Sequence, residues 1–231
     1  MKFKKFLLAI IFIFGSISAS ASDFFSTEDA NKFFTFGGRL GFNTSNRTMA
    51  NSAFTEWNHN SWGLGFDAGV VASLNFKNYL SIQPGLFFES RSGDYAYATA
   101  YITNMDKPDT FTEMGHMRSY YLTLPVMAVV NFNLAENIRW SVEVGPYFQF
   151  CLQDSGHKNI TVLDRYPQMN DYFQYNAENN SADVGLKLGT GLQFNDHYYV
   201  GVHYKAGFCN AWSKPEGGRN KAWLFTIGYD F

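Results

Sequence analysis

The stretch from Trp62 to Phe76 carries an apolar residue at every second position, and the residues between are mostly Gly, Ser, Asp or Asn. Because successive side chains of a strand point to opposite faces, this pattern predicts a strand with one bulky apolar face and one small, largely polar face. A soluble half-buried strand usually turns charged or hydroxyl side chains to water. Bulky apolar side chains on the outside and small polar ones on the inside are typical of a strand that faces lipid in a closed barrel.

Seven further segments alternate in the same way, so we expect an all-β fold, an eight-stranded antiparallel up-and-down transmembrane β-barrel. The expected strands are residues 34–43, 62–76, 80–89, 120–132, 138–150, 183–194, 198–208 and 223–231. Short connections at 77–78, 133–137 and 195–197 alternate with long ones at 44–61, 90–119, 151–182 and 210–220. This alternation predicts short periplasmic turns and long, mobile extracellular loops, and aromatic residues at the strand ends predict two interfacial girdles.

The N-terminus has the features of an export signal. Three lysines open the chain, an apolar run covers residues 6–14, and Ala19-Ser20-Ala21 fits a small-x-small cleavage site. A retained anchor helix is the alternative, but the apolar run is much shorter than the roughly 20 residues that a spanning helix needs. We expect three parts: a signal peptide over residues 1–21, a short periplasmic segment over 22–32 and the barrel over 33–231.

Charge and composition exclude two classes of protein. Without the three lysines of residues 1–21, 15 basic and 20 acidic residues remain, a net charge of −5. Nucleic-acid binding relies on basic patches, so no nucleic-acid partner is expected. A helical membrane protein is excluded because no second apolar stretch is long enough to span. Alternating strands account for a chain with 19% aromatic and only 16% charged residues.

The inward row of the barrel gathers charged residues among many glycines. The interior of an eight-stranded barrel is just wide enough for side chains to fill, and buried charges are costly unless they pair. Arg39 is expected opposite Asp67, whereas Lys187 and Lys205 meet across their hairpin and need Glu143 or another carboxylate between them. We therefore expect a plugged lumen without a continuous channel. The expected polar network comprises Arg39, Asp67, Glu89, Glu143, Lys187, His203, Lys205 and Asp230.

A soluble lipocalin-like barrel is the main competing fold, since it also has eight strands with alternating faces. Its bulky apolar residues would surround a ligand inside, and its outer face would be charged. Here the row with small residues has few charges, and glycines dilute them. This dilution favours the membrane barrel.

Histidine positions bear on enzymatic and metal functions. His59, His116 and His157 fall in long connections, His197 in a turn and His203 in the lumen row. A lipid hydrolase would need Ser, His and an acid within reach of a lipid ester, and no histidine lies on the outer row. His116 near Glu113, or His157 near Asp154, is the remaining arrangement that suits a protease. We expect no enzyme activity, and no cofactor or metal site because no histidines share a ligand-like spacing.

Cys151 and Cys209 are the two cysteines of the chain. Both lie near the loop ends of their strands with inward parity, in a compartment where a disulfide can persist. Their strands are not neighbours, so a disulfide requires the strand ends to bend. The pattern favours two thiols and leaves the disulfide open.

Four runs of the chain have a family-like pattern: Thr35-Phe36-Gly37-Gly38-Arg39-Leu40-Gly41-Phe42-Asn43, the stretch from Gly69 to Pro84, Tyr121-Leu122-Thr123-Leu124-Pro125 and Val144-Gly145-Pro146-Tyr147. These runs resemble the PorT-like outer membrane protein beta-barrel domain family of Bacteroidetes. The closing Gly228-Tyr229-Asp230-Phe231 resembles the terminal aromatic signal that the barrel assembly machinery reads, which assigns that role to Tyr229 and Phe231. The resemblance covers about residues 33–231. Members are often called porins, and one relative takes part in protein secretion.

Together these patterns predict a non-enzymatic integral outer-membrane protein with a structural or surface-interaction role. A small-solute pore and an accessory component of a secretion system are the alternatives. The expected partners are outer-membrane lipid and lipopolysaccharide, the assembly machinery during insertion, and an unknown extracellular or periplasmic protein. We expect a monomer.

Overall fold

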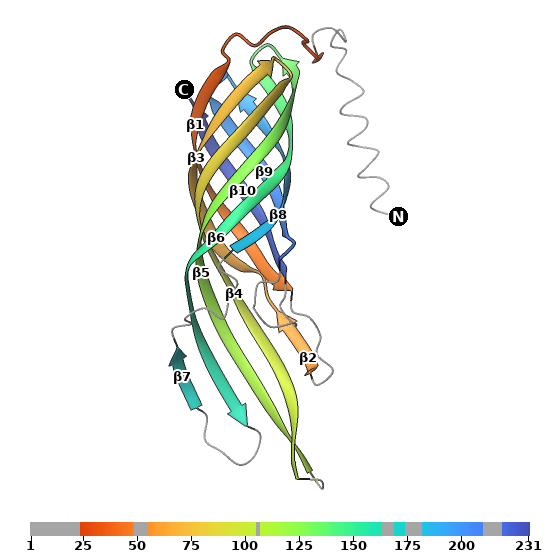
Figure 1. Ribbon diagram of the computed structural model, residues 1–231, viewed down its shortest axis with the longest axis vertical. Coiled ribbons are helices and arrows are strands. Elements are labelled where there is room, and N and C mark those ends of the chain that lie inside the picture. The colour runs from red at the N-terminus through yellow and green to blue at the C-terminus, as the bar shows by residue number, and fades with distance from the viewer. Residues whose placement is uncertain (1–23, 49–54, 105–106, 163–168, 174–181, 210–218) are drawn as a thin grey trace, which may run out of the picture.

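Eight antiparallel strands form a closed ring in the computed structural model, which describes residues 24–48, 55–104, 107–162, 169–173, 182–209 and 219–231 (Figure 1). The ring strands are β1 (Phe34–Thr48), β3 (Gly63–Lys77), β4 (Leu80–Asn104), β5 (Lys107–Ala135), β6 (Ile138–Val162), β8 (Ala182–Phe194), β9 (Tyr198–Gly207) and β10 (Arg219–Asp230). Each pairs with the next in chain order, and β1 pairs with β10 to close the ring. The predicted eight-stranded antiparallel barrel is confirmed.

Three ring strands continue far beyond the length that crosses a membrane. β4 has 25 residues, β5 has 29 and β6 has 25, whereas about 9–11 residues suffice to span a bilayer. The β4–β5 hairpin stays paired as far as Asn104 opposite Lys107. At its sides, β2 (Thr55–Asn60) pairs with β4, and β7 (Met169–Phe173) pairs with β6. We call this extension, in the order β2-β4-β5-β6-β7, the projecting sheet; it forms the lower half of Figure 1.

The prediction of loops at 90–119 and 151–182 is therefore wrong for most of these residues. Polar side chains without apolar alternation predict loops, but a strand outside the membrane needs no apolar face. Backbone hydrogen bonds to the neighbouring strands carry the sheet onward. The connection at 44–61 also contains strand, since β1 runs to Thr48 and β2 follows. Most of the connection at 210–220 lies outside the described residues.

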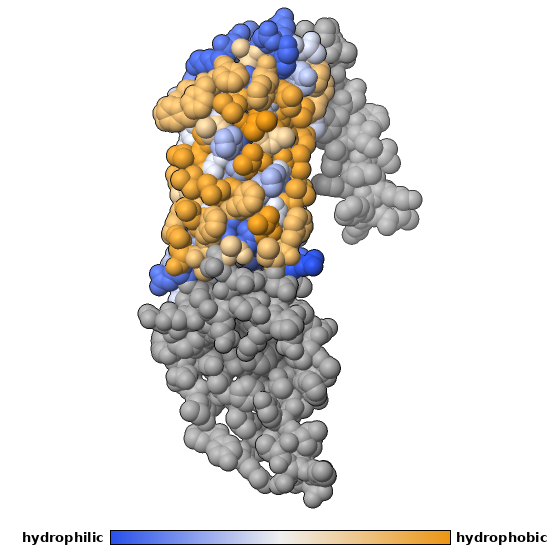
Figure 2. Space-filling model, in the orientation of Figure 1, coloured by the Kyte–Doolittle hydropathy of each residue, from blue (hydrophilic) through white to orange (hydrophobic). Residues whose placement is uncertain are grey.

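The outer face of the barrel is a continuous apolar band. Outward side chains are strongly exposed there, and Figure 2 shows them as an orange belt with hydrophilic residues at its upper end. This band includes Leu40, Leu64, Val70, Ile82, Leu86, Leu124, Val126, Val142, Val144, Val184, Leu188, Val200 and Ile227. So large an exposed apolar surface suits lipid and not water. No helix among the described residues is both long and apolar enough to cross a bilayer.

Aromatic pairs flank the apolar band at both ends. Near the short turns, Phe36 stacks on Phe231 at 4.7 Å between ring centroids, and Phe132 stacks on Trp140 at 5.0 Å. Near the other end, Phe88 stacks on Tyr120 at 5.8 Å and Tyr204 meets Trp223 at 4.9 Å. Their positions match the predicted girdles.

Three tight turns join neighbouring strands at one end of the barrel, which we call the turn end; the opposite end is the loop end. The turns are Asn78–Tyr79, Glu136–Asn137 and Asn195–His197. Asn195 and Asp196 have φ of 49° and 62°, the left-handed region that Asn and Asp tolerate better than most residues. The predicted connections at 77–78, 133–137 and 195–197 overlap all three turns.

Leu188 lies at the middle of β8 on the lipid-facing side and is 46% exposed. We predict that Leu188→Arg lowers the free energy of unfolding by about 2–4 kcal/mol, the cost of a cation at the bilayer midplane. Tyr198→Arg is the control, since Tyr198 lies at the turn end and the cost near the interface is about 0–1 kcal/mol. Denaturant titration in lipid vesicles measures both. Equal losses would contradict the assignment of the band to lipid.

Candidate functional site: the lumen and its turn-end vestibule

The middle of the lumen holds a four-residue cluster around Glu89 on β4. Lys205 Nζ on β9 lies 2.7 and 3.0 Å from the two carboxylate oxygens, and Arg91 Nη2 donates to Oε2 at 2.8 Å. Gln149 Oε1 accepts from Arg91 at 2.8 Å and from Lys205 at 3.3 Å. All four side chains are at most 6% exposed. The cluster satisfies the buried carboxylate with two cations from different walls of the barrel.

A second cluster, around Glu143 on β6, lies nearer the turn end. His203 Nε2 is 2.8 Å from Glu143 Oε2, and Tyr199 Oη and Ser141 Oγ donate to Oε1 at 2.7 and 2.8 Å. Glu143 and His203 are 4% and 3% exposed. The carboxylate thus accepts hydrogen bonds on both of its oxygens.

Arg39 pairs with a different acid from the one expected. Its Nη1 lies 2.7 Å from Asp230 Oδ1, and its guanidinium lies over the Tyr199 ring at 4.4 Å. Asp230 also accepts from Gln193 Nε2 at 2.9 Å. The expected pair with Asp67 does not form, because the β1–β3 register places Asp67 opposite Gly41 and leaves Gly69 opposite Arg39.

Lys187 and Lys205 face each other across β8 and β9, as predicted. The carboxylate that Lys205 binds is Glu89, from β4, and Glu143 is held by His203 instead. Lys187 Nζ lies 5.1 Å from the centre of the Phe87 ring and forms no ion pair with a described residue. Its positive charge therefore balances the negative charge of the surrounding carboxylates only at longer range.

Asp67, at 1% exposure, is buried in the loop-end half of the lumen. Neither of its carboxylate oxygens receives a hydrogen bond of good geometry from the described residues. The predicted pairing of Asp67 with a cation is therefore not seen as a direct contact among the described residues.

Two tyrosines complete the filling of the lumen. Tyr147 is fully buried, packs under Lys205 Nζ at 4.3 Å and reaches Asp183 at 3.4 Å. Gly185 makes room for it, since a Cβ there would lie 2.5 Å from the Tyr147 ring. Gly191 makes room for Tyr199 in the same way. These two glycines of the inner row thus leave the space that its tyrosine rings occupy.

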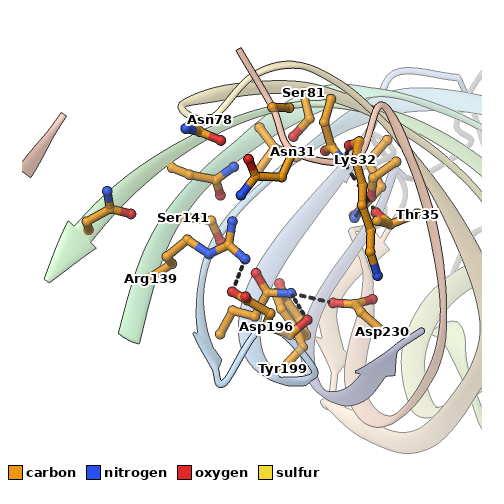
Figure 3. A pocket seen from close by; sticks show the side chains of 18 of the residues that line it. Asn31, Lys32, Thr35, Asn78, Ser81, Arg139, Ser141, Asp196, Tyr199 and Asp230 are labelled. Atoms are coloured by element: carbon orange, nitrogen blue, oxygen red, sulfur yellow. Dashed lines mark hydrogen bonds and ion pairs between the residues drawn. The ribbon is translucent and has the colours of Figure 1, made fainter. Parts of the chain in front are cut away.

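The lumen opens at the turn end into a polar cavity of about 860 Å³, which we call the vestibule. Figure 3 shows its wall, with Arg139 bound to Asp196 and with Asp230 near Tyr199. Amide, hydroxyl and charged side chains line most of it, including Asn31, Thr35, Asn78 and Ser81. Its inner end is formed by Arg39, Glu143 and Tyr199. Beyond them lies a space of about 10 Å³, room for about one water molecule. The vestibule is therefore closed toward the middle of the barrel.

The segment before β1 runs along the rim of the vestibule, and we call residues 24–33 the strap. Phe25 packs on Tyr79 at 4.4 Å and Phe24 stacks on Phe132 at 5.2 Å. Asp29 pairs with Lys77 at 2.5 Å, and this hydrogen bond lowers the pKa of Asp29. Backbone and side-chain hydrogen bonds from Asn78 to the strap add to these contacts.

The loop end brings together a serine, an aspartate and a histidine, but their contacts do not suit a serine hydrolase. His116 Nδ1 lies 2.6 Å from Asp94 Oδ1, and Ser61 Oγ lies 3.4 Å from Asp94 Oδ2. A serine nucleophile needs its hydroxyl at the histidine, with the acid behind the imidazole. Here the acid separates serine and histidine. In the described part of the chain, no three His, Cys, Asp or Glu residues gather as a metal site would.

Other predicted features have mixed outcomes. Cys151 and Cys209 are not joined by a disulfide. Tyr229 and Phe231 lie on the outer surface at the turn end, 41% and 58% exposed. His116 contacts Asp94, and the side chain of Glu113 lies outside the described residues. The signal peptide and the side chains of His59, His157 and Asp154 lie outside the described residues.

Sequence reasoning missed Arg91, which it assigned to a loop. The signal was present, since Arg91 follows Glu89 by two residues and so continues the inward row. Gln149 was on the inward row but was not recognised as the group that links Arg91 to Lys205. The vestibule had no sequence signal because it depends on the strap and three turns coming together.

Glu89 is the residue whose loss should cost the lumen most. We predict that Glu89→Gln lowers the free energy of unfolding by about 3–5 kcal/mol, because it leaves Lys205 and Arg91 buried without their counter-charge. Asp29→Asn removes an exposed ion pair and should leave stability unchanged. Denaturant titration of the refolded barrels gives both values. A small effect for Glu89→Gln would mean that the cluster is hydrated.

The filled lumen predicts that the purified protein conducts no steady ion current in a planar bilayer. Tyr147, Lys205 and Gln149 leave no open cross-section at the middle of the barrel. The control is the Tyr147→Ala/Tyr199→Ala double variant, which removes two large side chains from the lumen and should raise the conductance. Stepwise openings of the wild-type protein would contradict the closed lumen.

The solved structures that this chain is similar to share little sequence identity with it. No curated protein matches the chain. Among solved structures, the chain is similar to the attachment invasion locus protein Ail of Yersinia pestis, at 13% identity over 87% of this chain and 100% of that one, with a TM-score of 0.40. It is also similar to OprG from Pseudomonas aeruginosa, at 10% identity over 90% and 99% with a TM-score of 0.41, and to the outer membrane enzyme PagL, at 13% identity over 80% and 97% with a TM-score of 0.39.

A protein family also matches this chain, over most of its length. A family described as outer membrane protein beta-barrel domain matches residues 21–212, which is most of the chain. Its location, the outer membrane, agrees with the apolar band and the closed ring of strands. The chain therefore belongs to the outer membrane protein beta-barrel domain family.

Proposed function

We propose that this protein is a non-enzymatic, non-conducting barrel whose role is to hold the projecting sheet outside the outer membrane, where it contacts another macromolecule. The observation that carries this proposal is the continuation of β4, β5 and β6 beyond the apolar band, joined by β2 and β7. Such a sheet has no part in crossing the membrane.

The orientation belongs to the same proposal. Outer-membrane barrels turn their short connections to the periplasm and their long ones outward. The turn end, with the strap and both ends of the folded barrel, therefore faces the periplasm, and the projecting sheet faces outside. A wide, hydrogen-bonded β-surface offers backbone edges at β2 and β7 and suits a protein partner.

Further details remain part of the proposal. They include export through a signal peptide cleaved after Ala21, which leaves a periplasmic segment at 22–32. Reading of Tyr229 and Phe231 by the assembly machinery fits their exposure at the turn end. The sequence runs described above support membership of the PorT-like branch in Bacteroidetes, and the closed single-chain ring supports a monomer.

A second candidate function is an accessory role in a secretion machine, and the vestibule favours it. A cavity of about 860 Å³ open at the periplasmic side, with a strap at its rim, gives a periplasmic protein a place to dock. A small-solute pore has less support, because the inner end of the vestibule is closed by Arg39, Glu143 and Tyr199.

The projecting sheet can be shortened without touching the barrel. Asp94 and His116 are directly opposite in the β4–β5 ladder, so an Asn-Gly turn in place of residues 95–115 should close the hairpin at that point. We predict that this variant inserts and folds like wild type but loses the crosslinked adducts that wild-type cells form at their surface. The control carries Asn-Gly in place of residues 105–106 alone. Unchanged adducts in the shortened variant would contradict the proposal.

A further inference from the structure

The loop end of β10 places two cations on the lipid side of the barrel. Side chains alternate along β10, and Asn220 points into the lumen, where its Nδ2 donates to Asp183 Oδ2 at 3.1 Å. Arg219 and Lys221 therefore point outward; Arg219 is exposed and Lys221 half-buried. At about 3.3 Å per residue, their Cα atoms are roughly 7 Å apart on one face.

Among the described residues, these two cations have no counter-charge from the protein itself. Neither forms an ion pair with a described residue, in contrast to Lys205, Arg39 and Arg91 in the lumen. The neighbours of Lys221 on the flanking strands are Asn46 and Ala206, which are both uncharged. As far as the described strands show, the positive charge is thus available to a group outside the protein.

The position of the cations relative to the membrane is set by the residues below them. Trp223 follows Lys221 on the same face and packs against Tyr204 at 4.9 Å, and Phe225 and Ile227 continue into the apolar band. Aromatic side chains of this kind lie at headgroup level. Arg219 and Lys221 therefore lie at or just above the lipid headgroups, and hydrophilic atoms border the lower edge of the orange belt in Figure 2.

The opposite wall differs. β5 lies four strands from β10 in either direction around the ring. On β5, Arg118 comes two residues before the girdle residue Tyr120, just as Lys221 comes two residues before Trp223 on β10. Two residues before Arg118, where β10 has its second cation, β5 has His116, which pairs with the exposed Asp94. The paired positive charge is a property of the β10 wall.

We propose that Arg219 and Lys221 bind the phosphate groups of an outer-leaflet glycolipid. The proposal rests on the orientation proposed above, which puts the loop end in the outer leaflet. Two adjacent cations above an aromatic pair fit an acyl chain on the band and a phosphate beside it. The occupant is a lipid because the site is continuous with the lipid-facing band.

The test measures lipid retained by the folded, detergent-purified protein in native mass spectrometry. The probes are bisphosphorylated lipid A, the same lipid without phosphates, and phosphatidylglycerol. We expect the Arg219→Gln/Lys221→Gln variant to retain bisphosphorylated lipid roughly 25-fold less than wild type, since each basic group near an anionic lipid contributes about fivefold. Wild type should retain the dephosphorylated lipid no better than the variant does. Heat-modifiable migration in gels checks that each variant is folded.

Arg118→Gln is the matched control and should retain the lipid within about twofold of wild type. An equal loss from Arg118→Gln and Lys221→Gln would overturn the proposal, as would equal retention of phosphatidylglycerol. Competition by inorganic phosphate at lipid-like concentrations would assign the site to a free anion and overturn the lipid assignment. Any of these failures leaves the projecting sheet unaffected, because that proposal is tested by surface adducts.

Discussion

The pairing of β1 with β10 is the contact on which the rest of the structure depends. In hydrocarbon no water can satisfy a backbone N–H or C=O group, so a sheet spans a membrane only when its first and last strands close it. Twelve consecutive residue pairs, from Gly37 opposite Asp230 to Thr48 opposite Arg219, make that closure. It forces one face of every ring strand outward to lipid and the other into a narrow interior.

The narrow interior in turn explains the inner row. With eight strands there is space for side chains and little else. Large residues such as Tyr147 and Tyr199 fit only because glycines face them, and charges fit only because they meet across the lumen. The Glu89 cluster joins β4 to β9 on the opposite wall, and the Glu143 cluster joins β6 to β9 past the intervening β8.

Sequence periodicity was sufficient for the barrel itself and for which side chains of its strands point outward or inward. It predicted a strand at residues 62–76, where β3 runs from Gly63 to Lys77, found all eight ring strands and assigned Lys187 opposite Lys205. It failed where the answer depends on contacts between distant strands: Asp230 reaches Arg39 through the closing seam, and Glu89 reaches Lys205 across the lumen. It also failed beyond the membrane, because polar strands such as the outer half of β4 lack the apolar alternation that identifies a strand in lipid.

The length of β5 has a thermodynamic consequence for recognition. A strand of 29 residues leaves about a dozen beyond the loop-end girdle, which is roughly 40 Å of extended chain. A flexible loop of that reach would lose conformational freedom on meeting a partner, at a cost that subtracts from affinity. Here the ladder to β4 and β6 has already restricted the backbone. Folding of the barrel thus pre-organises a contact surface at a distance from the bilayer, and binding need not order it again.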